Sequence, residues 1–330
     1  MNFTKNIIKI IKFKLSIIFF TIERLIRKLI IYFIAIIQLI LKSFGAGKTA
    51  FQFFIKTMQS LKRKQAVFAN YIPTKHDIFV CTYSKSGTNW MMQIAQQIIE
   101  YGEAEFDNIY DKIPFPDPLI INGVNLNDPR PQKQTPTGLR VIKTHFESDF
   151  VPYNSTSKYL IVLRNPVETL VSGYYFAHDN IGTNKIEYTV EEWLNLAQTP
   201  DYPFDSWASH TASYWHWKNR PNVLILTYGN MKRDLKKAVT QVASFLEVKL
   251  CESQLATIVY KSSYSYMKQH TTKFSPPFYF IGFKPEIVRK GETGKSEEIL
   301  TPSQQATYIE FCKKELQRLQ VVFPWEEIFP

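Results

Sequence analysis

The alternation of apolar and polar positions divides the chain into two unlike parts. Residues 1–64 hold long apolar runs, interrupted mainly by basic residues, and the longest uncharged run there is Leu29–Leu41. Beyond residue 66 the apolar runs are short and alternate between strand-like and helix-like spacing. We therefore predict an N-terminal helical extension over residues 1–65 and a globular domain over residues 66–330.

The second part shows the order of elements that is typical of an α/β fold. Short runs rich in β-branched and aromatic residues predict strands at residues 77–83, 141–144, 159–163 and 223–227. Apolar residues at helical spacing predict helices at 90–101, 167–176, 190–197, 204–218 and 231–246. The Pro-rich segment 113–136 predicts a long loop. Strands that alternate with helices favour a parallel sheet covered on both faces, so we predict a central parallel sheet flanked by helices.

The formal net charge of +11 is concentrated in the extension. Residues 1–64 carry 13 of the 40 Lys and Arg residues but only one of the 29 acidic residues, and the charges of the remaining chain nearly cancel. A basic segment that is also strongly apolar favours an anionic lipid surface over nucleic acid. We expect no nucleic-acid partner, and we expect residues 1–64 to contact a membrane surface.

The run Leu29–Leu41 is shorter than the roughly 20 residues that a membrane-spanning helix needs. Charges recur through the extension and no small-residue cleavage site follows, so we expect no cleaved signal peptide. We predict an interfacial or re-entrant helical anchor on the cytoplasmic side. Two alternatives stay open: a single span over residues 25–44, with Arg27 and Lys28 reaching the surface, and an amphipathic helix packed on the domain.

The cysteine content gives no sign of a disulfide framework. Cys81, Cys251 and Cys312 are odd in number and far apart, and no C-x-x-C pair occurs. The sequence also lacks an H-E-x-x-H segment and a carboxylate cluster with ligand spacing. We therefore expect a reducing compartment and no metal site.

The segment Y-S-K-S-G-T-N-W, residues 83–90, lies between a predicted strand and a predicted helix. Small residues around a glycine let backbone amides turn towards an anion, and the helix N-terminus adds free N–H groups and a partial positive charge. A lysine in the loop supplies a full charge for a phosphate oxygen. We expect this loop to hold a phosphate through Lys85, Ser86, Gly87, Thr88 and Asn89.

Two further segments place polar residues at strand ends. Arg164 follows the strand at 159–163 and can clamp an anion, and Ser172 lies eight positions later on the next helix. Lys143 and His145 alternate at the end of the strand at 141–144, so they lie on the same face of an extended chain. A histidine there can accept a proton near neutral pH.

Together these segments resemble the signatures of the cytosolic-type sulfotransferases. The first signature of that family is similar to Y-P-K-S-G-T-x-W, and residues 83–90 depart from it by Ser84 in place of proline. The resemblance implies sulfuryl transfer from 3′-phosphoadenosine-5′-phosphosulfate to an acceptor hydroxyl or amine. It also implies that the loop grips the 5′-phosphosulfate, that Trp90 stacks near the adenine, and that Arg164 and Ser172 bind the 3′-phosphate.

The resemblance continues towards the C-terminus. The R-K-G at residues 289–291 is similar to the last phosphate loop of the family, and residues 262–268 are similar to the segment before it. Nucleotide contacts are thereby implied for Tyr228, Ser262, Tyr264, Arg289, Lys290 and Gly291. The resemblance also makes His145 the favoured base, with Lys85 and Lys143 stabilising the charge that develops during in-line displacement.

The sequence gives less information about the identity of the acceptor. Tyr279, Phe280 and Phe283, in an expected loop, suggest an apolar site for a lipophilic, lipid-like or other small-molecule acceptor. Only Thr301 fits the short dimer motif that many family members carry after R-K-G, which argues against that mode of dimerisation. The alternatives to a sulfotransferase are a membrane-tethered nucleotide-binding protein without turnover and a P-loop phosphoryl-transfer enzyme. A further alternative places the domain in the Golgi lumen.

Overall fold

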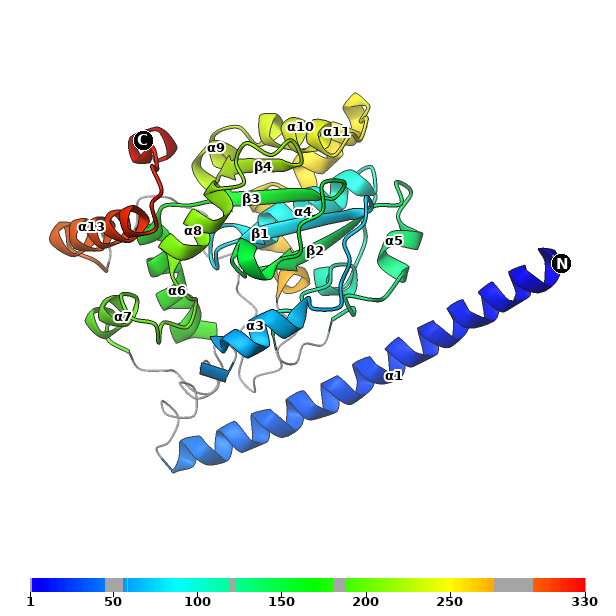
Figure 1. The fold of residues 1–330 in the computed structure, drawn as a ribbon, viewed down its shortest axis with the longest axis horizontal. Coiled ribbons are helices and arrows are strands. Elements are labelled where there is room, and N and C mark those ends of the chain that lie inside the picture. The colour runs from blue at the N-terminus through cyan, green and yellow to red at the C-terminus, as the bar shows by residue number, and fades with distance from the viewer. Residues whose placement is uncertain are drawn as a thin grey trace.

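The computed structural model describes residues 2–44, 56, 57, 59–118, 123–180, 188–275 and 299–329 (Figure 1). Four strands of this part form one sheet: β1 (Asp77–Thr82), β2 (Arg140–Thr144), β3 (Lys158–Leu163) and β4 (Val223–Thr227). Their order across the sheet is β2-β1-β3-β4, and every neighbouring pair is parallel. The predicted parallel sheet is therefore confirmed, and each predicted strand agrees with an observed one to within one residue.

The helices of the body begin with α3 (Leu61–Val67), α4 (Thr88–Ile99), α5 (Arg130–Gln134), α6 (Pro166–Asn180), α7 (Val190–Leu196) and α8 (Trp207–Trp215). They continue with α9 (Tyr228–Arg233), α10 (Leu235–Phe245), α11 (Glu252–Lys261), α12 (Tyr264–Gln269), α13 (Pro302–Arg318) and α14 (Trp325–Ile328). Short 3-10 turns lie at Ile109–Asp111, Ser148–Phe150 and Thr271–Phe274. The predicted boundary at residue 65 falls within α3, and the division into two domains stays a prediction.

Helices cover both faces of the sheet, as successive side chains of β1 show. Ile78 and Val80 pack in one core cluster with residues of α4, α10 and α11. Phe79 and Cys81 point the other way, into a cluster with Phe68, which precedes the sheet, and Tyr214 of α8, which lies between β3 and β4 in the chain. All six β1 residues are buried, because side chains alternate between the two faces and each face is covered.

Two predicted elements need correction. The segment 231–246 is not one helix, because α9 ends at Arg233 and α10 begins at Leu235. Asp234 lies between them with a φ of −145°, and its carboxylate accepts a hydrogen bond from the backbone N of Lys237. An aspartate that caps a new helix favours this break over helix continuation. The predicted loop at 113–136 contains the short helix α5.

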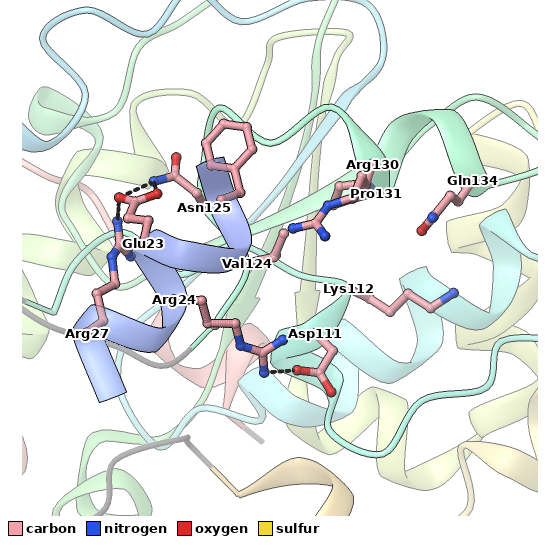
Figure 2. A pocket seen from close by; sticks show the side chains of 12 residues that line it. Glu23, Arg24, Arg27, Asp111, Lys112, Val124, Asn125, Arg130, Pro131 and Gln134 are labelled. Carbon is pink, nitrogen blue, oxygen red and sulfur yellow. Dashed lines mark hydrogen bonds and ion pairs between the residues drawn. The ribbon is translucent and has the colours of Figure 1, made fainter. Parts of the chain in front are cut away.

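The N-terminal extension begins with a single helix, α1 (Asn2–Ser43), which lies beside the body (Figure 1). Polar contacts join its middle to the body: Arg24 forms an ion pair with Asp111, and the Asn125 amide donates to Glu23 at 3.0 Å (Figure 2). These residues border a small pocket between α1 and the loops before α5. At this point the contacts of α1 with the body include an ion pair and a hydrogen bond, and the apolar Phe20 also borders the pocket.

The opposite side of α1 carries an apolar stripe. Its members recur at spacings of three and four residues, and each is at least half exposed: Leu15, Ile18, Ile22, Leu25, Leu29, Phe33, Ile36 and Ile40. Because a helix turns by about 100° per residue, these positions fall on one face. No helix in the described part of the chain combines the length and the apolar character that crossing a membrane requires.

Candidate active site

The candidate site lies at the carboxyl edge of the sheet, where loops of three neighbouring strands meet. The loop after β1 carries Lys85, the segment after β2 carries His145, and Arg164 follows β3. The order β2-β1-β3 places the predicted phosphate loop, residues 83–90, between the other two. In open parallel sheets this edge is the usual place for ligand binding. Residues that lie up to 79 positions apart are thereby brought together.

The phosphate loop has the backbone shape that its glycine allows. Gly87 has a φ of +97° and is the residue that precedes the first turn of α4. A Cβ on Gly87 would lie 2.8 Å from the Cδ2 of Tyr228, so any larger residue would collide with that ring. Lys85 also has a positive φ, 68°, which costs a non-glycine residue about 1 kcal/mol. Backbone strain of this kind concentrates at functional sites.

Some hydroxyl groups around the loop form hydrogen bonds within the protein, and others do not. The hydroxyls of Thr88 and Thr82 share a hydrogen bond of 2.6 Å. The Oγ atoms of Ser86 and Ser262 are buried and have no hydrogen-bond partner. Buried hydroxyls are nearly always hydrogen-bonded in proteins, so two unpartnered ones suit an anionic ligand that accepts from them.

Arg164 connects the loops after β3 and β1. Its Nη1 donates to the carbonyl of Lys85 at 3.0 Å, and its Nε donates to Glu168 at 2.9 Å. Its guanidinium carbon lies 4.1 Å from the centre of the Tyr228 ring, the same ring that packs against Gly87. Ser172 is partly buried on α6, two turns after the N-terminus of that helix. These contacts fix the Arg164 side chain beside the phosphate loop.

The predicted adenine neighbours connect α4 to the C-terminal helices. The indole Nε1 of Trp90 donates to the carbonyl of Ser262 at 2.8 Å, and its ring meets that of Tyr228 edge-on at 5.4 Å. The amide nitrogen of Asn89 donates to the carbonyl of Phe274 at 3.0 Å. Tyr264 lies exposed on the first turn of α12. The predicted contacts of Arg289, Lys290 and Gly291 lie outside the described residues.

His145 is held by two contacts from neighbouring segments. Its Nδ1 lies 2.7 Å from the carbonyl of Thr82, and its backbone N donates to the Oδ2 of Asp117 at 2.5 Å. A carbonyl can only accept, so Nδ1 carries the proton and Nε2 has a free lone pair. Burial and the ammonium of Lys143 hold the pKa of His145 well below its usual value, so the ring is neutral near pH 7.

Lys143 is buried beside the histidine, with 4% of its surface exposed. Its Nζ donates to the hydroxyl of Tyr110 at 2.6 Å and lies 3.8 Å from the centre of the Phe115 ring. Burial lowers the pKa of Lys143 to about 7, and the ammonium of Lys85 acts in the same direction. The ammonium of Lys85 lies 4.1 Å from the centre of the Phe176 ring. Two lysines therefore lie at one electropositive edge.

The sequence patterns missed two of the polar groups near His145, Asp117 and Arg63. Asp117 is buried with its Oδ1 unpartnered, and burial raises its pKa to about 6. Arg63 of α3 has two buried nitrogens, Nε and Nη1, without a partner. His210 of α8 is buried among aromatic rings, and neither of its ring nitrogens has a partner. Asp117 falls in the Pro-rich segment and Arg63 in a basic run, so neither has a motif that would single it out.

Comparisons with known proteins agree over most of the chain. Residues 75–320 match the family model of the sulfotransferase domain. Sulfotransferase 1B1 of the mouse is 29% identical over 259 residues, an alignment that covers 76% of this chain and 86% of that protein. Sulfotransferase 1 family member D1 of the mouse is 30% identical over 257 residues, with 73% and 83% covered.

A solved structure shows the same similarity. The crystal structure of mouse sulfotransferase SULT7A1 complexed with PAP superposes with a TM-score of 0.60 and 25% identity, and the alignment covers 79% of this chain and 91% of that one. The fold, the arrangement of the candidate site and the extent of these matches lead to one conclusion. This chain belongs to the sulfotransferase family, and it is a sulfotransferase enzyme.

Proposed function

We propose that this sulfotransferase uses 3′-phosphoadenosine-5′-phosphosulfate as its donor. The observation that carries the proposal is the meeting of a phosphate loop, Arg164 and the Lys143–His145 pair at one edge of the sheet. The unpartnered hydroxyls of Ser86 and Ser262 lie on the two segments that Trp90 connects. A nucleotide with phosphates at both its 3′ and 5′ positions fits such a set of donors.

In the proposed reaction, the acceptor oxygen attacks sulfur while the bond from sulfur to the 5′-phosphate oxygen breaks. His145 takes the acceptor proton at Nε2, because Nδ1 is bound to the Thr82 carbonyl. Lys85 and Lys143 stabilise the negative charge on the departing phosphate and the sulfuryl oxygens. Adenosine 3′,5′-bisphosphate leaves, and water then receives the proton from His145.

The charges of the site favour this division of roles. A neutral His145 can accept a proton, but its low pKa makes it a weak base in the ligand-free enzyme. An anionic donor beside His145 and Lys143 raises the pKa of both groups, since negative charge favours the protonated forms. Donor binding thus favours the charged form of Lys143, which can then stabilise the departing phosphate.

The donor proposal is tested by calorimetric titration with adenosine 3′,5′-bisphosphate. The Ser86→Ala variant should bind the nucleotide about tenfold more weakly, because a hydrogen bond to a charged group is lost. Its melting temperature without nucleotide should not fall, since the Oγ of Ser86 has no partner in the protein. Ser244→Ala, at an exposed serine of α10, is the control.

Transfer of radiolabelled sulfate to a panel of phenols, alcohols and amines completes this test. A wild-type protein that binds ATP with Mg²⁺ more tightly than the bisphosphate would contradict the proposal and favour a phosphoryl-transfer enzyme. Binding of the bisphosphate without transfer to any acceptor would favour a nucleotide-binding protein without turnover.

We also propose that α1 lies on the surface of a membrane, facing anionic lipid such as that of the cytoplasmic leaflet. Its exposed apolar stripe has the width and spacing of an interfacial helix, and its polar side carries Arg24, Arg27 and Lys28. A stripe of this length exceeds what soluble proteins usually leave in water. An enzyme at that surface is well placed for a lipophilic acceptor.

Flotation with vesicles of phosphatidylcholine, with and without phosphatidylserine, tests the proposal. We expect the chain to float with the vesicles, and more completely when phosphatidylserine is present, because basic residues accompany the stripe. If a second copy covered the stripe instead, the chain would sediment as a dimer in lipid-free buffer and would not float.

A further inference from the structure

Lys143 is held at the candidate site by a tyrosine that no sequence motif singled out. The Nζ of Lys143 donates to the hydroxyl of Tyr110 at 2.6 Å and lies 5.0 Å from the centre of the Tyr110 ring. Among the described residues, Tyr110 is the hydrogen-bond partner that the structure gives this nitrogen. A lysine side chain is long and flexible, so a contact at its end largely decides where its charge lies.

Tyr110 is itself fixed by its own segment. It lies in the 3-10 turn Ile109–Asp111, and it is 1% exposed in the core cluster that includes residues of β1 and α4. The backbone N of Tyr110 donates to the Oδ1 of Asn108 at 3.0 Å. The carbonyl of Tyr110 accepts from the backbone N of Val124 at 2.9 Å. The hydroxyl of Tyr110 is therefore a preorganised partner for Lys143.

A hydroxyl differs from a carboxylate as the partner of a buried lysine. A carboxylate would neutralise the charge of Lys143, whereas burial raises the pKa of Tyr110 and keeps its phenol neutral. The phenol oxygen accepts one N–H of the ammonium and leaves the other two for an anion. Tyr110 thus places the ammonium and leaves its charge available to the phosphate and sulfuryl oxygens of the donor.

We propose that Tyr110 is a positioning residue for sulfuryl transfer, whose hydroxyl holds the ammonium of Lys143 in place and favours its protonated form. An oxygen acceptor stabilises a charged ammonium more than a neutral amine, so this contact opposes the effect of burial on Lys143. The inference rests on the proposed function, since it takes Lys143 as a group that stabilises the departing phosphate. Tyr110 acts through Lys143 and takes no proton in the reaction.

The first test follows Lys143 in the ligand-free enzyme by NMR, with isotope-labelled lysine side chains. The Lys143 resonance is assigned by its absence from Lys143→Met. The wild type should titrate near pH 7, because the pKa of Lys143 is about 7. Tyr110→Phe should lower that midpoint to about pH 6, because the ammonium loses a hydrogen bond. The other titratable groups that act on Lys143 or on its neighbour, Lys85, Asp117 and His145, are retained in this variant.

Asp111→Asn is the matched control on the same turn. It removes the ion pair with Arg24 of α1 and leaves the contact between Tyr110 and Lys143 in place. The Lys143 midpoint should stay near pH 7. The kcat for sulfate transfer should stay within about twofold of the wild type, since an exposed ion pair contributes little. Equal changes in Asp111→Asn and Tyr110→Phe would mean that the turn matters and the hydroxyl does not, which would contradict the inference.

The second test is a double-mutant cycle of kcat for sulfate transfer to a phenol. Tyr110→Phe should lower kcat about tenfold, because the ammonium is no longer held at the reacting oxygens. In the Lys143→Met background the same substitution should change kcat by less than about twofold, because the group that it positions is absent. A merely structural role would lower kcat equally in both backgrounds, and melting curves would show the loss of stability.

Two results would overturn the inference. One is a Lys143 midpoint that does not move in Tyr110→Phe, and the other is a fall in kcat that is the same with and without Lys143. A shifted midpoint in an enzyme that does not bind adenosine 3′,5′-bisphosphate would instead overturn the proposed donor and leave the role of Tyr110 towards Lys143 intact.

Discussion

Helices α4 and α1 differ in the exposure of their apolar residues. In α4, which follows the phosphate loop, Met91, Met92, Ile94 and Ile98 are completely buried against the sheet and α10. In α1, the apolar stripe faces away from the body, and Leu29 is 62% exposed. Arg24 and Glu23, which lie outside the stripe, bind Asp111 and Asn125 of the body.

This difference in exposure suggests separate roles for the two helices, α4 in catalysis and α1 in membrane binding. The packing of α4 fixes the strand–loop–helix segment that holds the phosphate loop, so changes there should alter catalysis. Nothing in the part of the chain that the structure describes covers the stripe of α1, so changes there should alter membrane binding and leave the chemistry intact. The predictions below test whether the two regions are independent in this sense.

The largest effect is expected from His145→Ala. Loss of the proposed base should lower kcat for sulfate transfer by about 10³-fold or more. Affinity for adenosine 3′,5′-bisphosphate should stay within about threefold, and vesicle flotation should not change. His216→Ala, at an exposed histidine just after α8, serves as the control and should keep full activity. An equal loss of nucleotide binding would contradict the assignment of His145 as the base.

The next effect is expected from the double substitution Ile22→Glu and Leu29→Glu, which places two charges in the stripe. Each buried aliphatic side chain contributes about 1.5–3 kcal/mol to membrane burial, so vesicle affinity should fall by about 10²-fold or more. Removal of residues 1–44 should abolish flotation. Sulfate transfer to a water-soluble phenol should be unchanged in both proteins. Loss of that transfer would show that α1 contributes to the active site and would break the separation of tasks.

A smaller effect concerns pH and Lys143. With a pKa of about 7, Lys143 is mostly neutral at about pH 8 in the free enzyme, and an anionic nucleotide should raise that pKa. Binding of adenosine 3′,5′-bisphosphate at about pH 8 should therefore take up close to one proton. Nucleotide affinity should decrease as the pH rises through the pKa of the free enzyme.

Calorimetry in buffers of different ionisation enthalpy measures this proton uptake. Lys143→Met should remove most of it, while Lys249→Met, at an exposed lysine, should not. If the wild type takes up no proton on binding, then Lys143 is already charged in the free enzyme and the described pKa shift does not govern the site.

The smallest effect is expected from Arg24→Gln, which removes the ion pair between α1 and Asp111. Both side chains are about a third exposed, and ion pairs of this kind contribute about 0–1 kcal/mol. The melting temperature of the body and the rate of sulfate transfer should change little. A large fall in melting temperature would mean that α1 is part of the folded core, and the contrast with α4 would not hold.

The sequence by itself predicted the sheet and most helices, and it singled out residues 83–90 as a loop between a strand and a helix. Alternating and helical spacings depend only on local geometry, and a strand–loop–helix segment with a glycine is also a local pattern. The break at Asp234 was missed because apolar spacing continues through it, and only the cap shows where one helix ends.

The tertiary structure alone decided which polar groups meet. Asp117 and His145 come from a Pro-rich segment and a strand end, and no spacing rule connects them, yet they share a hydrogen bond. It also decided which side of α1 faces the protein, because sequence periodicity defines an apolar stripe but not what covers it. Burial and electrostatic neighbours exist only in the folded chain, and for that reason the lowered pKa of Lys143 and the raised pKa of Asp117 could not be predicted from the sequence.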